Sequence, residues 1–141
     1  MISVSDDNTL RLWDLSLYQC TTVIRGVKCL ISNSLSQIDK DRVIVGEANT
    51  IWIVNIDKCV IEKTIEDQSL LFVYCFLKLR DNIILCGCGN GLFCFYDINT
   101  GQYKTTLNNH KMFITDLLLI DDNTFLSTSG DETIKVWKIK M

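Results

Sequence analysis

The sequence contains no proline, although average usage of about 5% would supply several in 141 residues. Histidine is represented only by His110. No apolar run is long, because the longest spans residues 70–77, far short of the roughly 20 residues that a membrane helix needs. Proline removes a backbone donor, so its absence permits strands anywhere in the chain. No segment keeps a period of 3.6 residues over ten or more positions, so a helical fold is not expected.

The net charge is −3, and Lys and Arg form no basic patch. Binding to a phosphate backbone needs such patches, so no nucleic-acid partner is expected. The first seven residues lack a basic segment followed by an apolar one, so we expect no secretory leader and a cytoplasmic or nuclear location. The seven cysteines are odd in number and show no paired spacing, which disfavours structural disulfides. A hydrophobic content of 48% indicates a globular chain.

A repeat of about 41 residues runs through the chain. Four segments superpose without internal gaps, at residues 5–15, 46–56, 88–98 and 129–139. One column holds large residues at intervals of 41, 42 and 41 residues, namely Trp13, Val54, Tyr96 and Trp137. Two further apolar columns contain Leu12, Ile53, Phe95 and Val136, and Leu15, Ile56, Ile98 and Ile139. Agreement of several columns over three intervals indicates a structural repeat.

Each period has the pattern of short strands separated by turns. Residues 42–46 and 82–86 are apolar runs followed by turn residues, as expected of strands buried on both faces. Residues 99–101, Asn-Thr-Gly, are typical of a hairpin turn. The repeat therefore predicts one four-stranded sheet in about every 41 residues. A single sheet cannot bury both of its faces, so the copies are expected to stack.

The repeat resembles the WD-repeat family. The features that carry the resemblance are the period, the dipeptide Trp13-Asp14, and the pattern Ser-x-Asp-x-Thr at residues 5–9 and 129–133. The resemblance implies an all-β β-propeller of four-stranded antiparallel blades, with about four blade units. The units are expected at about 1–26, 27–67, 68–109 and 110–141, within one partial propeller domain spanning 1–141.

The family's structural tetrad is implied most fully in the last unit. There it would consist of His110, Ser127 or Ser129, Asp131 and Trp137, with Asn109 in place of the family's glycine. The first unit retains a partial set, which contains Ser3, Ser5, Asp7 and Trp13. In the two middle units the tetrad Asp column contains Ala48 and Asn90, and the His column contains Val27 and Gln68. We expect apolar packing alone to hold these units.

Strand counting predicts an incomplete propeller. The first unit lacks an innermost strand and the last lacks an outer strand, which leaves three, four, four and three strands. Because propellers close with 4–8 complete blades, we expect an open arc from the C-terminal part of a longer protein. Such an arc would have bare apolar faces at both ends. Bare faces and open sheet edges favour association, so the isolated chain is expected to self-associate.

Three patterns suggest chemistry but have simpler explanations in the repeat. Cys86, Cys88 and the nearby Cys94 invite a metal or redox interpretation, but zinc-site spacings are absent. In the ungapped alignment Cys86 falls in a column with Ser3, Ile44 and Ser127, and Cys88 in one with Ser5, Gly46 and Ser129. Buried free cysteines of this kind behave as small hydrophobic residues. The glycine-rich residues 87–91 precede a strand rather than a helix, so they do not form a phosphate loop.

Titratable residues give no further support for catalysis. His110 has no positioned nucleophile in the sequence, and its place in the repeat is structural. The acidic pairs at residues 6–7 and 121–122 fall in predicted turns, where Asp is favoured by bonds to nearby backbone. We therefore expect no enzyme activity, no metal and no cofactor.

The most consistent function is a non-catalytic protein-interaction scaffold or adaptor. Loops on rigid scaffolds commonly carry binding residues. The resemblance places partner peptides on the face formed by the loops before the innermost strands, where Asp6, Lys28, Glu47, Lys111 and Met112 are expected. The alternative is the substrate-recognition part of a ubiquitin ligase or other enzyme complex, with catalysis residing elsewhere.

Overall fold

The computed structural model describes residues 1–29, 34–80, 82–108 and 110–139. These residues form four antiparallel sheets. The first sheet contains β1 (Ile2–Ser5), β2 (Thr9–Asp14) and β3 (Gln19–Arg25). The second contains β4 (Leu35–Gln37), β5 (Arg42–Glu47), β6 (Thr50–Asn55) and β7 (Val60–Glu66). The third contains β8 (Val73–Lys78), β9 (Ile83–Cys88), β10 (Leu92–Asp97) and β11 (Tyr103–Asn108). The fourth contains β12 (Ile114–Asp121), β13 (Thr124–Ser129) and β14 (Ile134–Lys138).

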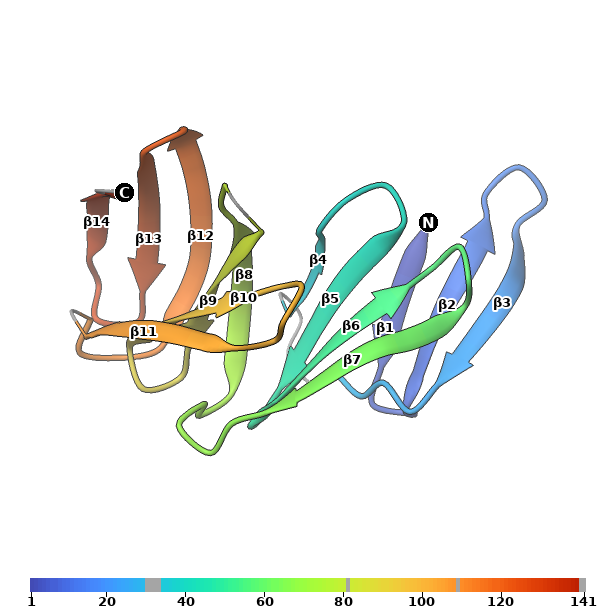
Figure 1. The fold of residues 1–141 in the computed structure, drawn as a ribbon. Helices are drawn as coiled ribbons and strands as arrows, with labels where there is room; N and C mark the ends of the chain where they lie inside the picture. The colour runs from blue at the N-terminus through green and yellow to red at the C-terminus, as the bar shows by residue number, and fades with distance from the viewer. Residues whose placement is uncertain (30–33, 81, 109, 140–141) are drawn as a thin grey trace.

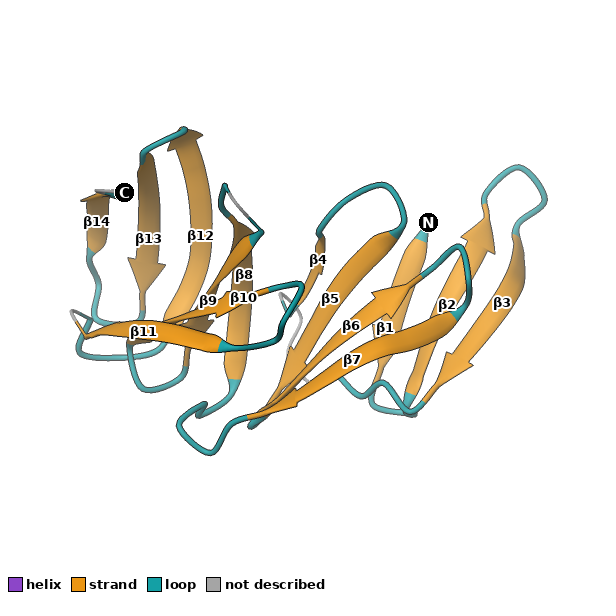
Figure 2. Cartoon of the chain, in the orientation of Figure 1, coloured by secondary structure: helices purple, strands orange, loops and turns teal. Residues whose placement is uncertain are grey.

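The four sheets follow one another in chain order, each beside the next (Figure 1). The first sheet, in blue, lies at one end of the assembly and the fourth, in red, at the other. Figure 2 shows only strands and connecting loops. In the ranges given above, no helix has the length and apolar character needed to cross a membrane. The predicted all-β fold of four blade units in an open arc is confirmed.

Strand pairing corrects the ungapped alignment of the second unit. Ser5 pairs with Thr9 across a three-residue turn, whereas Glu47 pairs with Thr50 across a turn of two residues. Because the second turn is one residue shorter, each residue of β5 occupies the column that the ungapped alignment gave to the residue before it. Val45, not Ile44, therefore shares a column with Ser3, Cys86 and Ser127. By the same shift Glu47, not Gly46, shares a column with Ser5, Cys88 and Ser129.

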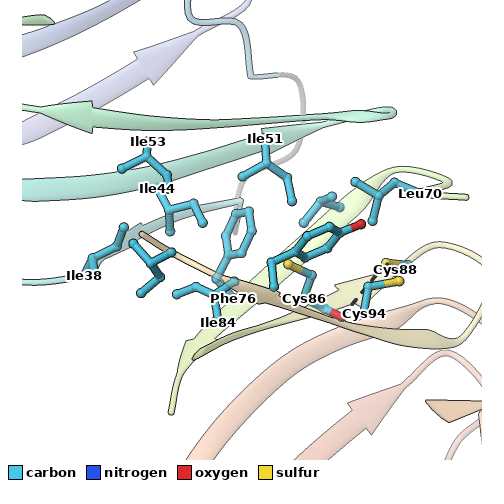
Figure 3. Close-up of a cluster of buried hydrophobic side chains, with 13 residues drawn as sticks. Ile38, Ile44, Ile51, Ile53, Leu70, Phe76, Ile84, Cys86, Cys88 and Cys94 are labelled. Atoms are coloured by element: carbon cyan, nitrogen blue, oxygen red, sulfur yellow. Dashed lines mark hydrogen bonds between the residues drawn. The ribbon is translucent and has the colours of Figure 1, made fainter. Parts of the chain in front are cut away.

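The hydrophobic core lies between neighbouring sheets rather than inside any one of them. One buried cluster joins the second and third sheets, and Figure 3 shows Ile44, Ile51 and Ile53 on one side of it and Phe76 and Ile84 on the other. Two further clusters join the first sheet to the second and the third to the fourth. The innermost strand β12 lies against β8 and β9, and β8 lies against β4 and β5. Each interior sheet is thus covered on both faces, as propeller packing requires.

Two glycines allow neighbouring sheets to approach closely. A Cβ atom at Gly87 would lie 2.6 Å from Cys75 Sγ and 2.8 Å from Ile114 Cγ2. At Gly46, in the same column of the second sheet, it would lie 2.6 Å from Phe76 Cζ. Neither glycine has a positive φ angle, so the backbone conformation does not require glycine at these positions. Their role is to leave space for the next sheet.

We predict that Gly87→Ala destabilises the fold by about 1–3 kcal/mol, because the added methyl group overpacks the contact with Ile114. Urea unfolding followed by tryptophan fluorescence measures the change. Thr64→Ala, on an exposed position of β7, is the control and should shift stability by no more than about 0.5 kcal/mol. An unchanged midpoint for Gly87→Ala would show that the sheets can separate without cost.

Candidate functional site

A chain of hydrogen bonds ties the loop before β12 to β13 and β14. His110 Nε2 lies 2.7 Å from Ser127 Oγ, and Trp137 Nε1 donates to the same oxygen at 2.8 Å. His110 and Ser127 are buried, with 3% and 0% exposure. A neutral imidazole with its proton on Nδ1 satisfies every group, because Nε2 then accepts from the serine hydroxyl. Of the two serines considered from the sequence, Ser127 is therefore the one that joins His110 to Trp137.

Asp131 completes this network at its outer end. Its Oδ2 lies 2.9 Å from His110 Nδ1 and accepts the backbone N–H of Lys111 at 2.9 Å. Its Oδ1 accepts from the Thr133 backbone and hydroxyl. The Thr133 hydroxyl, the Lys111 amide and His110 outweigh desolvation and hold the pKa of Asp131 well below its usual range. Ser129 lies beside the network and donates to the carbonyl groups of Met112 and Phe113. Asn109 lies outside the described residues.

Ser127, His110 and Asp131 are linked by hydrogen bonds in the order, and at the distances, of a Ser–His–Asp catalytic triad. Burial decides against that chemistry in this structure. Ser127 Oγ is shielded from solvent and already accepts the Trp137 indole proton, so it has no path to a substrate. What the arrangement does is satisfy buried polar groups between three segments of the fourth sheet.

The first sheet carries a shorter version of the same arrangement. Trp13 Nε1 donates to Ser3 Oγ at 2.8 Å, the same distance as in the fourth sheet. Asp7 accepts from the backbone and hydroxyl of Thr9, at 3.0 and 2.6 Å, and forms an ion pair with Arg11. Ser5 Oγ accepts the Asp7 backbone N–H at 3.3 Å. The partial set is thus linked locally, around the β1–β2 turn.

The third sheet is not held by apolar packing alone, which corrects the expectation for the middle units. The hydroxyl of Tyr96, in the tryptophan column, donates to Asp67 Oδ2 at 2.6 Å. Asp67 lies in the loop before β8 and also accepts the backbone and hydroxyl groups of Ser69. A Tyr–Asp bond thus joins loop and sheet where the fourth sheet uses His, Ser and Trp. The column alignment missed it because Asp67 is one residue away from Gln68.

The cysteine cluster is buried between the second and third sheets (Figure 3). Cys88 Sγ lies 3.8 Å from Cys94 Sγ, and Cys86, Cys88 and Cys94 are all free and 0% exposed. Burial raises the pKa of the Cys86 thiol well above its ordinary value, so this thiol remains neutral. Over the part of the chain that the structure describes, no group of three or more potential ligands is placed to bind a metal.

The residues predicted to contact partners lie on one face, formed by the loops before the innermost strands and the turns before the third strands. We call it the loop face; it runs along the lower edge of Figure 1. Asp6 and Lys28 form an ion pair at 3.3 Å, while Lys111 and Met112 are exposed. Glu47 differs from the expectation, since it is only 6% exposed. Its Oε2 atom is buried without a hydrogen-bond partner among the described residues.

Leu71 and Phe72 also lie on the loop face, and the sequence did not single them out. They are 54% and 48% exposed, although both are large and apolar. They border a hollow of about 160 Å³ that is also lined by Ala48, Asn49, Gln68 and Leu70. Phe72 has a φ angle of 51°, which is strained for a bulky residue. Their only signal in the sequence was membership of the longest apolar run, residues 70–77.

A larger hollow, of about 350 Å³, separates the third and fourth sheets at their outer side. Apolar side chains line most of it, including Phe95, Leu107, Phe125, Trp137 and Ile139. It lies beside the unpaired edge of β14, at the position that β7 and β11 occupy in the second and third sheets. The hollow therefore lies between the outer strand β11 of the third sheet and the edge strand β14 of the fourth.

We predict that Trp137→Ala costs about 3–5 kcal/mol and exceeds the cost of Trp13→Ala by at least about 1 kcal/mol. Trp137 packs against Phe93 and Phe125 at ring distances of 5.0 and 5.9 Å, and its serine also bonds His110. The Trp13 indole donates to Ser3, and in the described part of the chain its ring has no contact with another aromatic ring. Chemical denaturation of both variants gives the comparison, and equal shifts would remove any special role of the histidine network.

The Tyr96–Asp67 bond gives a pH-dependent prediction. Burial disfavours the charged form of Asp67, but hydrogen bonds from Ser69 and Tyr96 outweigh it and lower the pKa of Asp67. A carboxyl group with a lowered folded pKa stabilises the fold above its unfolded pKa of about 3.9, and the benefit is lost as pH falls through the folded value. Tyr96→Phe should therefore lose about 1 kcal/mol at neutral pH and progressively less below about pH 4.

Urea titrations at neutral and acid pH measure this difference, with Tyr103→Phe on the outer strand β11 as the control. A Tyr96→Phe defect of constant size at both pH values would mean that the phenol does not act through the carboxylate.

Comparison with known proteins assigns the repeat. Residues 101–138 match the sequence model of "WD domain, G-beta repeat". The chain is 21% identical over 145 residues to nuclear distribution protein nudF of Aspergillus niger, covering 99% of this chain and 33% of that protein. It is 32% identical over 65 residues to WD repeat-containing protein 55 of Arabidopsis thaliana, covering 45% and 18%. The chain thus spans a third or less of these relatives.

A solved structure has the same fold. The computationally designed Ika4 protein superposes with a TM-score of 0.79 at 25% identity, over 99% of this chain and 84% of that one. The repeat match falls on the unit that holds the His110, Ser127 and Trp137 network, and the sheets around it are built on the same columns. Residues 101–138 therefore form a WD repeat, and the chain is similar to WD-repeat β-propeller proteins along its length.

Proposed function

We propose that the chain is a non-catalytic protein-interaction scaffold that binds a partner segment through Leu71, Phe72 and Met112 of the loop face. The observation that carries the proposal is the pair of large apolar side chains, Leu71 and Phe72, half exposed beside a hollow. Apolar and aromatic side chains that fill pockets dominate protein interfaces. Met112, 48% exposed, lies in the corresponding loop of the next unit and extends the apolar surface.

The loop that carries Phe72 is built to hold this geometry. The backbone N–H of Gly89 donates to the carbonyl groups of both Leu71 and Phe72, at 2.7 and 2.9 Å. Asp67 fixes the start of the loop through Ser69 and Tyr96. A rigid loop loses little conformational entropy on binding, which favours affinity. The positive φ angle of Phe72 therefore has a use, because it keeps the ring at the surface.

The ion pair between Asp6 and Lys28 is a weaker candidate for the contact. Both side chains are largely exposed and already neutralise each other, so a partner would gain little from them. They are better placed to set specificity at the rim of an apolar contact. The WD repeat at residues 101–138 supports the scaffold role, since such domains generally bind protein partners. The ubiquitin-ligase alternative and the cytoplasmic or nuclear location stay predictions.

We predict that peptides selected on the immobilised chain from a displayed random library lose binding to the Phe72→Asn variant by at least tenfold. Asparagine tolerates a positive φ angle, so the loop conformation and the fold should be unchanged. Calorimetry with selected peptides measures affinity, and thermal melting checks stability.

Tyr18→Asn is the matched control. Tyr18 is also aromatic, 89% exposed and at a positive φ angle of 53°, but it lies in the β2–β3 turn at the opposite ends of the strands. Its replacement should leave peptide affinity unchanged. Selected peptides that bind the wild type and both variants equally would exclude the Phe72 surface as the contact.

A further inference from the structure

Glu47 carries a buried carboxyl group that the fold does not use. It is the last residue of β5 and pairs with Thr50 across the turn formed by Ala48 and Asn49. Its side chain is only 6% exposed. Of the buried side-chain nitrogen and oxygen atoms in the described ranges, Glu47 Oε2 alone lacks a hydrogen-bond partner. Because an unpaired buried acidic group costs free energy, its presence points to a donor supplied by a ligand.

The repeat gives no structural reason for an acidic residue at this position. Ser5, Cys88 and Ser129 occupy the same column in the other sheets, and all three are small. Ser129 donates to loop carbonyl groups and Ser5 accepts a backbone N–H, so each supports its own loop or turn. Within the described part of the chain, the Glu47 side chain has no comparable hydrogen bond and no ion pair. Its acidic group is therefore available to a partner.

Glu47 lies close to the apolar surface of the loop face, on the other side of one turn. A Cβ atom at Gly46 would lie 2.8 Å from Val73 Cβ, and Glu47 and Phe72 are the next residues toward the loop face. By alternation along β5, Gly46 faces the third sheet, whereas Glu47 shares the face of Val45, which packs toward the first sheet. A segment lying across the β5–β6 turn would therefore cover Phe72 and its hollow on one side and reach Glu47 on the other.

We propose that the partner segment of the loop face carries a lysine or arginine whose cationic group forms an ion pair with Glu47, while apolar residues beside it cover Leu71 and Phe72. The inference rests on the proposed function and adds the charge of the partner. A carboxylate forms its strongest hydrogen bonds with a cationic donor. Lysine and arginine also suit the narrow access to Glu47, because their long stems lie over apolar surface while the charged end reaches inward. The net charge of −3 favours the approach of a basic segment.

Peptides selected on the immobilised chain from a displayed random library test this inference by calorimetry. They should contain a lysine or arginine near an apolar residue, and replacing that basic residue by glutamine should weaken binding at least tenfold. Glu47→Gln should weaken binding of the original peptides by a similar factor and leave the affinity of the glutamine-substituted peptides unchanged within twofold. Such non-additive losses identify a direct contact between the two charged groups.

A second variant and a matched control guard against effects on the fold. Glu47→Ser installs the residue type that the first and fourth sheets carry in this column, so it should fold and show the same tenfold loss of affinity. Glu66→Gln is the control, because Glu66 pairs with Thr50 from the opposite strand and is exposed at the end of β7. Removing its charge should change peptide affinity less than twofold. Circular dichroism checks that each variant is folded.

The variants separate failure of this inference from failure of the proposed function. Peptides that lose binding to Phe72→Asn but bind both Glu47 variants like the wild type would overturn the ion pair and leave the proposed function standing. Peptides that lose binding to the Glu47 variants but not to Phe72→Asn would exclude the Phe72 surface and support Glu47 alone as the contact. Selected peptides without a basic residue would also overturn the inference, and failure to select any binding peptide would overturn both.

Discussion

The need to cover both faces of every sheet governs this protein. Each sheet is apolar on two sides, so none is stable alone, and stability is gained only at contacts between sheets. This constraint explains the glycines at positions 46 and 87, where a larger residue would push the next sheet away. It also explains why Leu10, Ile51 and Phe93 are buried beneath a following sheet, whereas Ile134, in the same column of β14, is exposed.

Polar links serve a different purpose from the apolar contacts, because they join loop to strand rather than sheet to sheet. The fourth sheet uses His110, Ser127 and Trp137, and the third uses Tyr96 with Asp67. The chemistry differs but the result is similar, since both fix the loop before the innermost strand. In the third sheet this fixed loop holds Leu71 and Phe72 at the surface. The Tyr96–Asp67 bond therefore supports the apolar surface that Leu71 and Phe72 form.

Two kinds of surface result from this architecture. The loop face is irregular, with a hollow and an aromatic ring held at a positive φ angle, and such features suit recognition of a specific partner. The outward surfaces of the first and fourth sheets are regular sheet surfaces whose residues match the interior contacts column by column.

The sequence by itself determined the repeat, the all-β class and the open arc, because these follow from periodic residue types along the chain. It named His110, Asp131 and Trp137 for the tetrad but left the choice between Ser127 and Ser129 to the tertiary structure. It could not determine the one-residue shift in the second sheet, which arises from pairing across a turn of two residues. The Tyr96–Asp67 bond, the burial of Glu47 and the exposure of Leu71 and Phe72 were likewise decided by tertiary structure. Each of these features depends on which segments meet in space. A column alignment compares only residues at the same position of each repeat, so it cannot show contacts between residues at different positions.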